Sequence, residues 1–188
     1  MDINGLIYIY YNNDTDKVLL NYYKKLLIKN ASNKDEIIRI FKTKFLKDFI
    51  ESSRLLINTN NLYPAALLLS SCIDILAKHY AGETTIYNVG ANYLDFSNNF
   101  FAEFKLHNMS SDFYKNFRCS LVHSNSTAID FTINDSIEVF CKSDGKKVIN
   151  LNWLILTTEK ILNNYISLIE CDNEKFKNFI AVQKHIYK

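Results

Sequence analysis

Apolar residues recur every three or four positions between residues 35 and 57, and this spacing predicts one long amphipathic helix. Its apolar face is formed by Ile37, Ile38, Phe41, Phe45, Phe49 and Leu56. A helix with one apolar face packs that face against a core.

A second helix is expected between the cap candidates Asn60-Asn61 and the terminating pair Ala81-Gly82. Pro64, the only proline of the chain, suits a first helical turn. The apolar residues that follow it are Leu67, Leu68, Cys72, Ile75 and Leu76. Because this segment is apolar on most sides through residue 72, we expect it at the centre of a helical bundle.

Four more helices are expected, each where a cap residue precedes a periodic segment. Residues 83–109 stay unassigned, because they are rich in aromatic residues and Gly90 breaks any long helix. The cap residues and expected extents are Asp14-Thr15-Asp16 for a helix to residue 29, Ser110-Ser111-Asp112 for a helix ending near His123, Asn152 for a helix to about Ile169, and Asp172-Asn173-Glu174 for a final helix.

The apolar period changes to that of β-strands after the helix that ends near His123. Residues 128–133 and 137–141 alternate, a turn signal follows at Ser143-Asp144-Gly145-Lys146, and residues 147–151 return as a third strand. The β-branched and aromatic residues 5–11 form a further strand candidate. The pattern therefore predicts a small antiparallel β element inserted among helices.

These elements predict a mainly α protein, an up-and-down helical bundle, in one domain of residues 1–188. Its core is expected at about residues 35–170, with an N-terminal extension of residues 1–34 and a C-terminal helix over residues 172–188. A hydrophobic fraction of 48% and a charged fraction of 22% are ordinary for a globular protein.

The composition and charge of the chain bear on its location in the cell and on its binding partners. The net charge of +2 is too small to argue for nucleic-acid binding by itself. The four cysteines stand singly, the N-terminus has no basic leader, and Asp74 interrupts the apolar stretch of residues 62–77. We therefore expect a cytoplasmic protein without a membrane span, and the separation of His79, His107 and His185 suggests no metal site.

The segment Arg118-Cys-Ser-Leu-Val-His123 carries two side chains that suit RNA cleavage without a metal. The planar, permanently charged guanidinium of an arginine binds and stabilises a phosphate, and a histidine transfers protons near neutral pH. Arginine is rare in this chain, with only Arg39, Arg54 and Arg118, so its presence here requires a reason.

The spacing of Arg118 and His123 does not place them on one stripe of a straight helix, because positions five apart differ by about 140° and about 7.5 Å of rise. The two groups can converge if the helix frays at Val122–Ser124, or if a dimer brings both pairs into one groove. We expect both effects to act together.

The segment from Phe113 to His123 resembles the R-x4–6-H signature of the HEPN superfamily, and residues 65–80 with Asp74 resemble the polar-marked core helix of that superfamily. The resemblance implies a helical bundle, usually dimeric, that is often a metal-independent endoribonuclease of toxin–antitoxin or antiviral systems, with no cofactor and with an antitoxin or defence protein as a partner. Some members bind RNA or nucleotides without cutting. Arg118 and His123 would be catalytic, Asp74 and Asn125 supporting, and Lys115 an RNA contact.

Two positions depart from the superfamily pattern. Members silenced by a partner nucleotidyltransferase have a tyrosine two residues after the histidine, where this chain has Asn125, which argues against that control. The residue after the motif arginine is often Asn, Asp or His, and here it is Cys119.

Each of these candidate residues also has a purely structural interpretation. Arg118 could form a salt bridge to Asp74 or Asp112, His123 could be a helix-end residue that the helix dipole favours, and Lys115 could simply be solvated. Asp74 could orient Arg118 or His123, or bond locally. The tyrosines available for base stacking, which core packing explains equally, are Tyr87, Tyr93 and Tyr114. The alternatives to a nuclease are a non-catalytic module that binds RNA, a nucleotide or a protein, and a purely structural helical domain.

Overall fold

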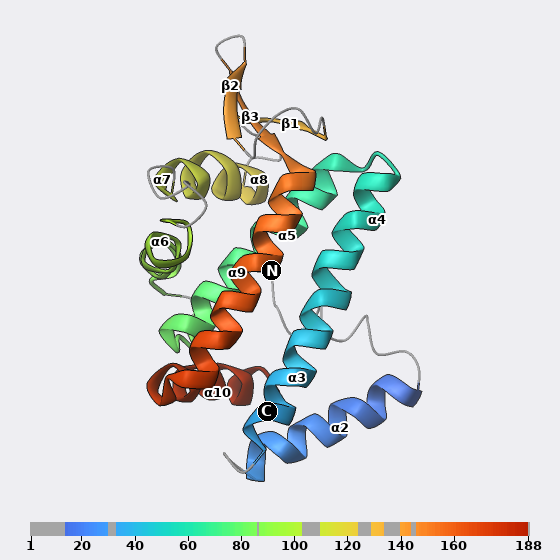
Figure 1. Cartoon of the computed structure of the whole chain (residues 1–188), viewed down its shortest axis with the longest axis vertical. Coiled ribbons are helices and arrows are strands. Elements are labelled where there is room, and N and C mark those ends of the chain that lie inside the picture. Colours follow the sequence, from blue (N-terminus) through green and yellow to red (C-terminus); the bar gives the residue numbers. More distant parts are fainter. Residues whose placement is uncertain are drawn as a thin grey trace.

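The computed structural model describes residues 14–29, 33–85, 87–102, 110–123, 129–133, 140–143 and 146–187, and it is a mainly α bundle (Figure 1). The helical elements are α2 (Asp14–Lys29), α3 (Lys34–Phe45), η1 (Leu46–Glu51), α4 (Ser52–Asn58), α5 (Leu62–Ala81), α6 (Val89–Phe100), α7 (Ser110–Asp112), η4 (Phe113–Cys119), α8 (Ser120–His123), α9 (Leu151–Cys171) and α10 (Asn173–Ile186). The elements η1 and η4 are π-helical turns inside longer helices.

The helix predicted over residues 35–57 is present as the continuous run of α3, η1 and α4. This run rises along the bundle, α5 returns beside it, and α9 lies against both (Figure 1). The first four residues of the predicted apolar face are buried, while Phe49 and Leu56 are partly buried against the same core. The amphipathic pattern is therefore confirmed.

Helix α5 lies at the centre of the bundle, as its nearly continuous apolar sequence predicted. It contacts α4, α6, α9 and α10 along its length, and Ala65, Leu69 and Leu76 are fully buried. Pro64 lies in its first turn. Gly82 ends it in the left-handed conformation with φ of 71°, where a side chain would also meet Asn178 at 2.8 Å.

The β element is a three-stranded sheet at one end of the bundle, with β1 (Ile129–Thr132), β2 (Phe140–Ser143) and β3 (Lys146–Asn150) in the order β1-β3-β2. Strands β2 and β3 are antiparallel as predicted, with Cys141 opposite Val148. The prediction that the whole element is antiparallel is wrong, because β1 runs parallel to β3. The sheet continues directly into α9 through β3 (Figure 1).

The predicted cap of α9 is also wrong. Asn150 is the N-cap and its Oδ1 accepts a 3.2 Å hydrogen bond from the backbone N–H of Trp153, while Asn152 donates to the carbonyl oxygen of Ile133. Asp172 caps α10 as expected, because its carboxylate accepts from the backbone N–H groups of Glu174 and Lys175.

The remaining predictions concern residues 5–11, residues 83–109 and membrane-spanning helices. The strand candidate at residues 5–11 lies outside the described residues. The unassigned stretch of residues 83–109 contains α6, and Gly90 lies in the first turn of this helix without breaking it. No helix within the described ranges combines the length and the apolarity that crossing a bilayer requires.

Candidate functional site

Arg118 lies in a helical run that extends from Ser110 to His123 and whose middle is the π-helical turn η4. Phe113, Phe117 and Leu121 repeat every four residues and are buried, so this spacing fixes one face of the run against the core. Turns with i→i+5 hydrogen bonds are rare inside helices and occur frequently at functional sites. Arg118 is one of the residues of this turn that are neither buried nor fully exposed.

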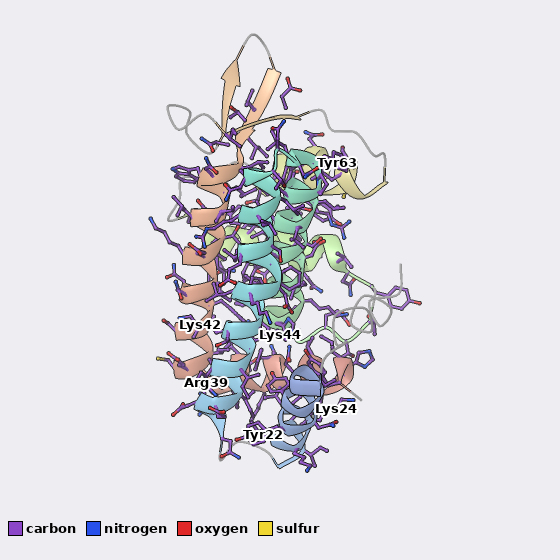
Figure 2. All side chains as sticks on the ribbon, turned by 90° about the vertical axis from the view of Figure 1, so that its right-hand side faces the viewer. Tyr22, Lys24, Arg39, Lys42, Lys44 and Tyr63 are labelled. Carbon is purple, nitrogen blue, oxygen red and sulfur yellow. The ribbon has the colours of Figure 1, made fainter. Side chains whose placement is uncertain are left out.

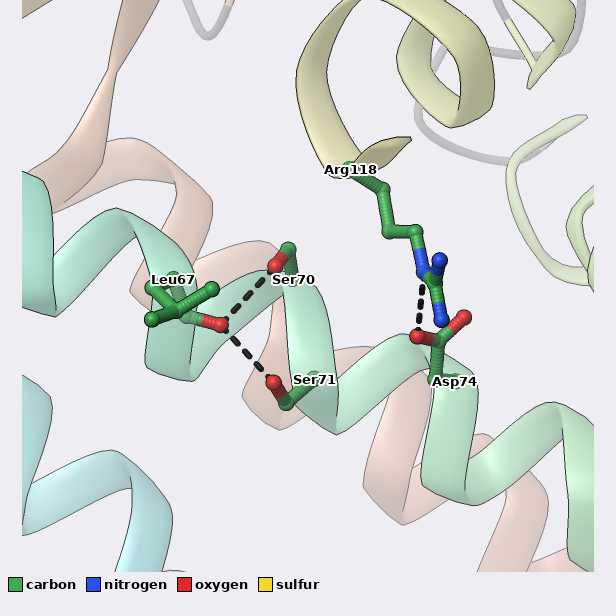
Figure 3. Close-up of polar contacts among 5 residues, drawn as sticks. All are labelled: Leu67, Ser70, Ser71, Asp74 and Arg118. Atoms are coloured by element: carbon green, nitrogen blue, oxygen red, sulfur yellow. Dashed lines mark hydrogen bonds and ion pairs between the residues drawn. The ribbon is translucent and has the colours of Figure 1, made fainter. Parts of the chain in front are cut away.

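Arg118 reaches across to α5 and forms an ion pair with Asp74 (Figure 3). Its Nε donates a 2.6 Å hydrogen bond to Oδ2 of Asp74, and the side chains are 16% and 20% exposed. Asp74 is the only acidic residue of α5. The salt bridge to Asp74, which was one structural interpretation of Arg118, is therefore present. It is also the contact by which Asp74 was expected to orient Arg118.

Two serines one turn earlier on α5 do not take part in this pair. Ser70 and Ser71 both donate to the carbonyl oxygen of Leu67, at 2.8 and 2.9 Å (Figure 3). This back-bonding satisfies their hydroxyl groups within the helix. Asp74 is thus the polar side chain that this stretch of α5 directs toward Arg118.

The electrostatics of the pair follow from its partial burial. Burial raises the pKa of the Asp74 carboxyl, and the guanidinium of Arg118 opposes this rise. Burial acts to lower the pKa of Arg118, but the attraction of Asp74 overcomes it and the pKa is raised. Because the guanidinium stays charged and donates directly to Oδ2, we treat Asp74 as ionised at neutral pH. Its second oxygen, Oδ1, is buried without a hydrogen-bond partner among the described residues.

Tyr114 flanks the guanidinium on the side of α6. The Cζ atom of Arg118 lies 5.7 Å from the centre of the Tyr114 ring, and this ring packs against Tyr93 at 4.9 Å. A Cβ atom on Gly90 would lie 3.0 Å from the Tyr114 hydroxyl, so the absence of a side chain at Gly90 makes room for this tyrosine. Sequence reasoning took Gly90 for a helix breaker and missed this packing role.

The three tyrosines named as stacking candidates have different environments. Tyr93 is fully buried and belongs to the core, whereas Tyr114 is partly buried beside Arg118. Tyr87 is 70% exposed. Of the three, Tyr114 is the one that the structure brings to Arg118.

His123 is the last residue of α8, so the motif lies in helix from its first residue to its last. The fraying predicted at Val122–Ser124 is therefore absent at Val122 and His123, and Ser124 lies outside the described residues. Arg118 and Cys119 belong to the π-helical turn, where i→i+5 bonding winds the chain less per residue than an α-helix. The side chain of His123 lies outside the described part of the chain, so its convergence with Arg118 stays a prediction. Asn125 lies outside the described residues.

A hydrogen bond from Tyr63 connects the start of α5 to the helical run of residues 110–123, which we call the motif helix. The Tyr63 hydroxyl donates a 2.7 Å hydrogen bond to the carbonyl oxygen of Leu121, in the last turn of α8. Carbonyl groups at helix ends lack helical partners, so this contact satisfies one of them. No sequence signal pointed to Tyr63, because it lies 58 positions from Leu121.

The other candidates lie apart from the Arg118–Asp74 pair. Lys115 is exposed one turn before Arg118. His79 is buried in the core and hydrogen-bonded to Ile75 and Gln183, His185 is on α10, and His107 falls outside the described residues. Within the described ranges no three His, Cys, Asp or Glu side chains are grouped as a metal site would require.

Comparison with known proteins adds no relative: no family model, no curated protein and no solved structure matches the chain.

Proposed function

We propose that this protein is a metal-independent endoribonuclease in which Arg118 and His123 act on the scissile phosphate of RNA. The observation that carries the proposal is the ion pair that holds Arg118 by its Nε, at 2.6 Å from Asp74, at a partly exposed position of a π-helical turn. An arginine held in this way is preorganised, and preorganised charge often contributes more to the rate enhancement of an enzyme than any other effect.

The roles of the residues follow from this arrangement. Asp74 positions Arg118 through Nε, and the terminal amino groups of the guanidinium are the part of the fork that a phosphate would contact. His123 transfers a proton. The 2′-oxygen of the substrate attacks phosphorus and loses its proton, the bond from phosphorus to the 5′-oxygen breaks, and that oxygen gains a proton. The products are a 2′,3′-cyclic phosphate and a 5′-hydroxyl.

The wider setting of the proposal comes from the resemblance of residues 113–123 to the HEPN signature. It includes a homodimer that brings two motif helices together, and a cytoplasmic role in a toxin–antitoxin or antiviral system with a neutralising or activating partner protein. Lys115, exposed one turn from Arg118, would contact a neighbouring phosphate.

A second candidate is a helical binding or interaction module without catalysis, and the same ion pair favours it. Arg118 has only 16% of its side chain exposed and is already paired with Asp74, as in a structural salt bridge. In this alternative the pair fixes the motif helix on α5, and RNA or a protein partner binds without being changed.

Incubation of the 188-residue protein with labelled single-stranded RNA in EDTA separates these candidates. The nuclease proposal predicts fragments that end in a 2′,3′-cyclic phosphate, and no cleavage at a position where the substrate carries a single 2′-deoxynucleotide. Binding without fragments would favour the non-catalytic module. Cleavage at the 2′-deoxy position would contradict the proposed chemistry.

A further inference from the structure

Tyr87 lies in the connection between α5 and α6 and presents its ring to solvent. The residue is 70% exposed, and Val89, two positions later, is 36% exposed. Tyr22 is the other exposed aromatic residue of the described ranges, at 46%. A ring exposed to this degree buries little apolar surface, so core packing does not account for a tyrosine at this position.

Hydrogen bonds fix the backbone at Tyr87. The Glu83 carboxylate accepts from the backbone N–H of Thr85 at 2.8 Å and from the Thr85 hydroxyl at 2.7 Å. The Thr85 hydroxyl oxygen accepts from the backbone N–H of Tyr87 at 3.2 Å. Asn88 follows with φ of 60°, a left-handed conformation that asparagine tolerates. The exposed ring is therefore carried by an ordered backbone, which lowers the entropy lost when a ligand binds.

Tyr87 lies within a short distance of Arg118. Gly90 is three residues after Tyr87, and a Cβ atom on Gly90 would lie 3.0 Å from the Tyr114 hydroxyl. Three residues span at most about 11 Å. The Tyr114 ring in turn lies 5.7 Å from the Cζ atom of Arg118, and α6 contacts the π-helical turn that carries both residues. These links limit the separation of Tyr87 from the guanidinium to the length of a few nucleotides.

The other two tyrosines named as stacking candidates are already in contact with protein groups. Tyr93 is fully buried. The Tyr114 ring contacts the Tyr93 ring at 4.9 Å and the guanidinium of Arg118. Tyr87 is therefore the one of the three whose ring is open to a ligand.

The charge beside Tyr87 indicates which part of a nucleotide it suits. Hydrogen bonds from Thr85 lower the pKa of the Glu83 carboxyl, so this group is ionised at neutral pH and repels a phosphate. A base carries no charge, and every base has a π-face on which an aromatic ring can stack. The positive charges that phosphates require are at Arg118 and at the exposed Lys115.

We propose that the ring of Tyr87 stacks on a base of the RNA substrate, a few nucleotides from the phosphate that Arg118 contacts. This inference rests on the proposed function and adds to it a position that binds a base. A protein partner is a poorer fit. Stable protein interfaces bury about 800 Å² on each side, and Tyr87 and Val89 are the exposed large apolar side chains that the described residues place here.

The test is fluorescence anisotropy with a labelled single-stranded RNA that carries 2′-O-methyl groups and so cannot be cleaved. The unmodified protein is compared with Tyr87→Ala, which removes the ring, and with Tyr87→Phe, which keeps it. The matched control is Tyr22→Ala. Tyr22 lies on α2, at the end of the bundle opposite to Tyr63, which bonds to the motif helix (Figure 2).

Tyr87→Ala is expected to bind about tenfold more weakly, and Tyr87→Phe to bind within about twofold of the unmodified protein. The Tyr22 variant should match the unmodified protein. The plot of log K against log salt should keep its slope in Tyr87→Ala, because no charge is lost, whereas Lys115→Gln should make it shallower by about 0.7. An unchanged melting temperature would show that Tyr87→Ala is folded, since the ring is exposed.

A second set of RNAs lacks one base at a time on either side of the cleaved phosphate. At the stacked position, the missing base should weaken binding of the unmodified protein about tenfold and leave the affinity of Tyr87→Ala unchanged, since the same contact is already absent.

Equal RNA affinity of Tyr87→Ala and the unmodified protein would overturn this inference and leave the nuclease proposal standing. An equal loss in the Tyr22 variant, or a loss in Tyr87→Ala that no missing base reproduces, would also overturn it. Absence of both binding and cleavage of RNA by the unmodified protein would overturn this inference and the nuclease proposal together.

Discussion

Asp74 and Arg118 lie 44 positions apart and are joined by a 2.6 Å hydrogen bond between Oδ2 and Nε. The contact connects the central helix α5 to the π-helical turn that carries the motif arginine. It fixes where the guanidinium lies, and both proposed functions depend on it. Removing the charge of Asp74 alone therefore tests what this contact does.

Asp74→Asn keeps the shape of the side chain and deprives Arg118 of its counter-ion. We expect the free energy of unfolding to fall by about 1–3 kcal/mol, since a partly buried charge loses a charged hydrogen-bond partner. Urea denaturation followed by circular dichroism measures the change. Glu159→Gln is the matched control, because it breaks the more exposed ion pair to Arg54, and there we expect a loss of at most about 0.5 kcal/mol. Equal effects of the two substitutions would contradict the account of Asp74.

The hydrogen bond from Tyr63 to Leu121 is expected to position the C-terminal turn of the motif helix. Tyr63→Phe removes the hydroxyl, and we expect a loss of about 1 kcal/mol in stability. The rate of RNA cleavage should fall as well, because His123 ends the same turn. The control is Tyr22→Phe, since Tyr22 is 46% exposed on α2. An unchanged cleavage rate in the Tyr63 variant would show that this contact does not position His123.

Gly90→Ala tests the packing of Tyr114. Alanine favours a helix over glycine by about 1 kcal/mol, but here its Cβ would lie 3.0 Å from the Tyr114 hydroxyl. We expect Tyr114 to shift, and RNA cleavage to weaken without unfolding of the protein. Adding Tyr114→Phe should restore part of the activity, because it removes the atom nearest to the new methyl group. Asn98→Ala, on the exposed side of α6, is the control and should leave cleavage unchanged.

A buried hydrogen-bond chain joins α2 to the centre of the bundle. The Tyr23 hydroxyl donates to Gln183 Oε1 at 2.8 Å, Gln183 Nε2 donates to His79 Nε2 at 2.5 Å, and His79 Nδ1 donates to the carbonyl oxygen of Ile75 at 2.7 Å. This direction of donation requires a neutral His79. Burial accordingly lowers the pKa of His79 from 6.5 to about 4.

This pKa fixes the sign of a pH dependence. The folded-state pKa of His79 lies below its unfolded value, so its contribution to stability is complete above pH 6.5 and is lost as the pH falls through about 4. The loss is on the order of 3 kcal/mol. His79→Gln supplies an acceptor that does not titrate, so its free energy of unfolding should fall less steeply between pH 6.5 and 4. Parallel curves for the two proteins would contradict the account.

Periodic patterns predicted the helices well because each one buries a face whose members are close in sequence. Phe113, Phe117 and Leu121, and the central position of α5, followed from this local information. The parallel pairing of β1 with β3 could not be predicted, because strand direction depends on how the chain crosses over between residues distant in sequence. The cap at Asn150, in place of Asn152, differs from the prediction by two residues, a difference that side-chain geometry decides.

The candidate site was predictable in its residues and less so in its geometry. The motif identified Arg118, and the single carboxylate in the apolar sequence of α5 pointed to Asp74 as a partner. The π-helical turn, the bond from Tyr63 and the fit of Tyr114 over Gly90 depend on how separate helices approach one another, which no spacing along the chain records.

The central claim is that Arg118 and His123 carry out the cleavage of RNA, and single-turnover cleavage in EDTA tests it most directly. Arg118→Lys keeps a positive charge opposite Asp74 but loses the planar fork, and His123→Ala removes the proton-transfer group. We predict that each variant is folded and loses at least about 100-fold in rate, while Arg54→Lys, at the remote ion pair on α4, keeps the full rate. Cleavage by both site variants at the rate of the unmodified protein would contradict the account.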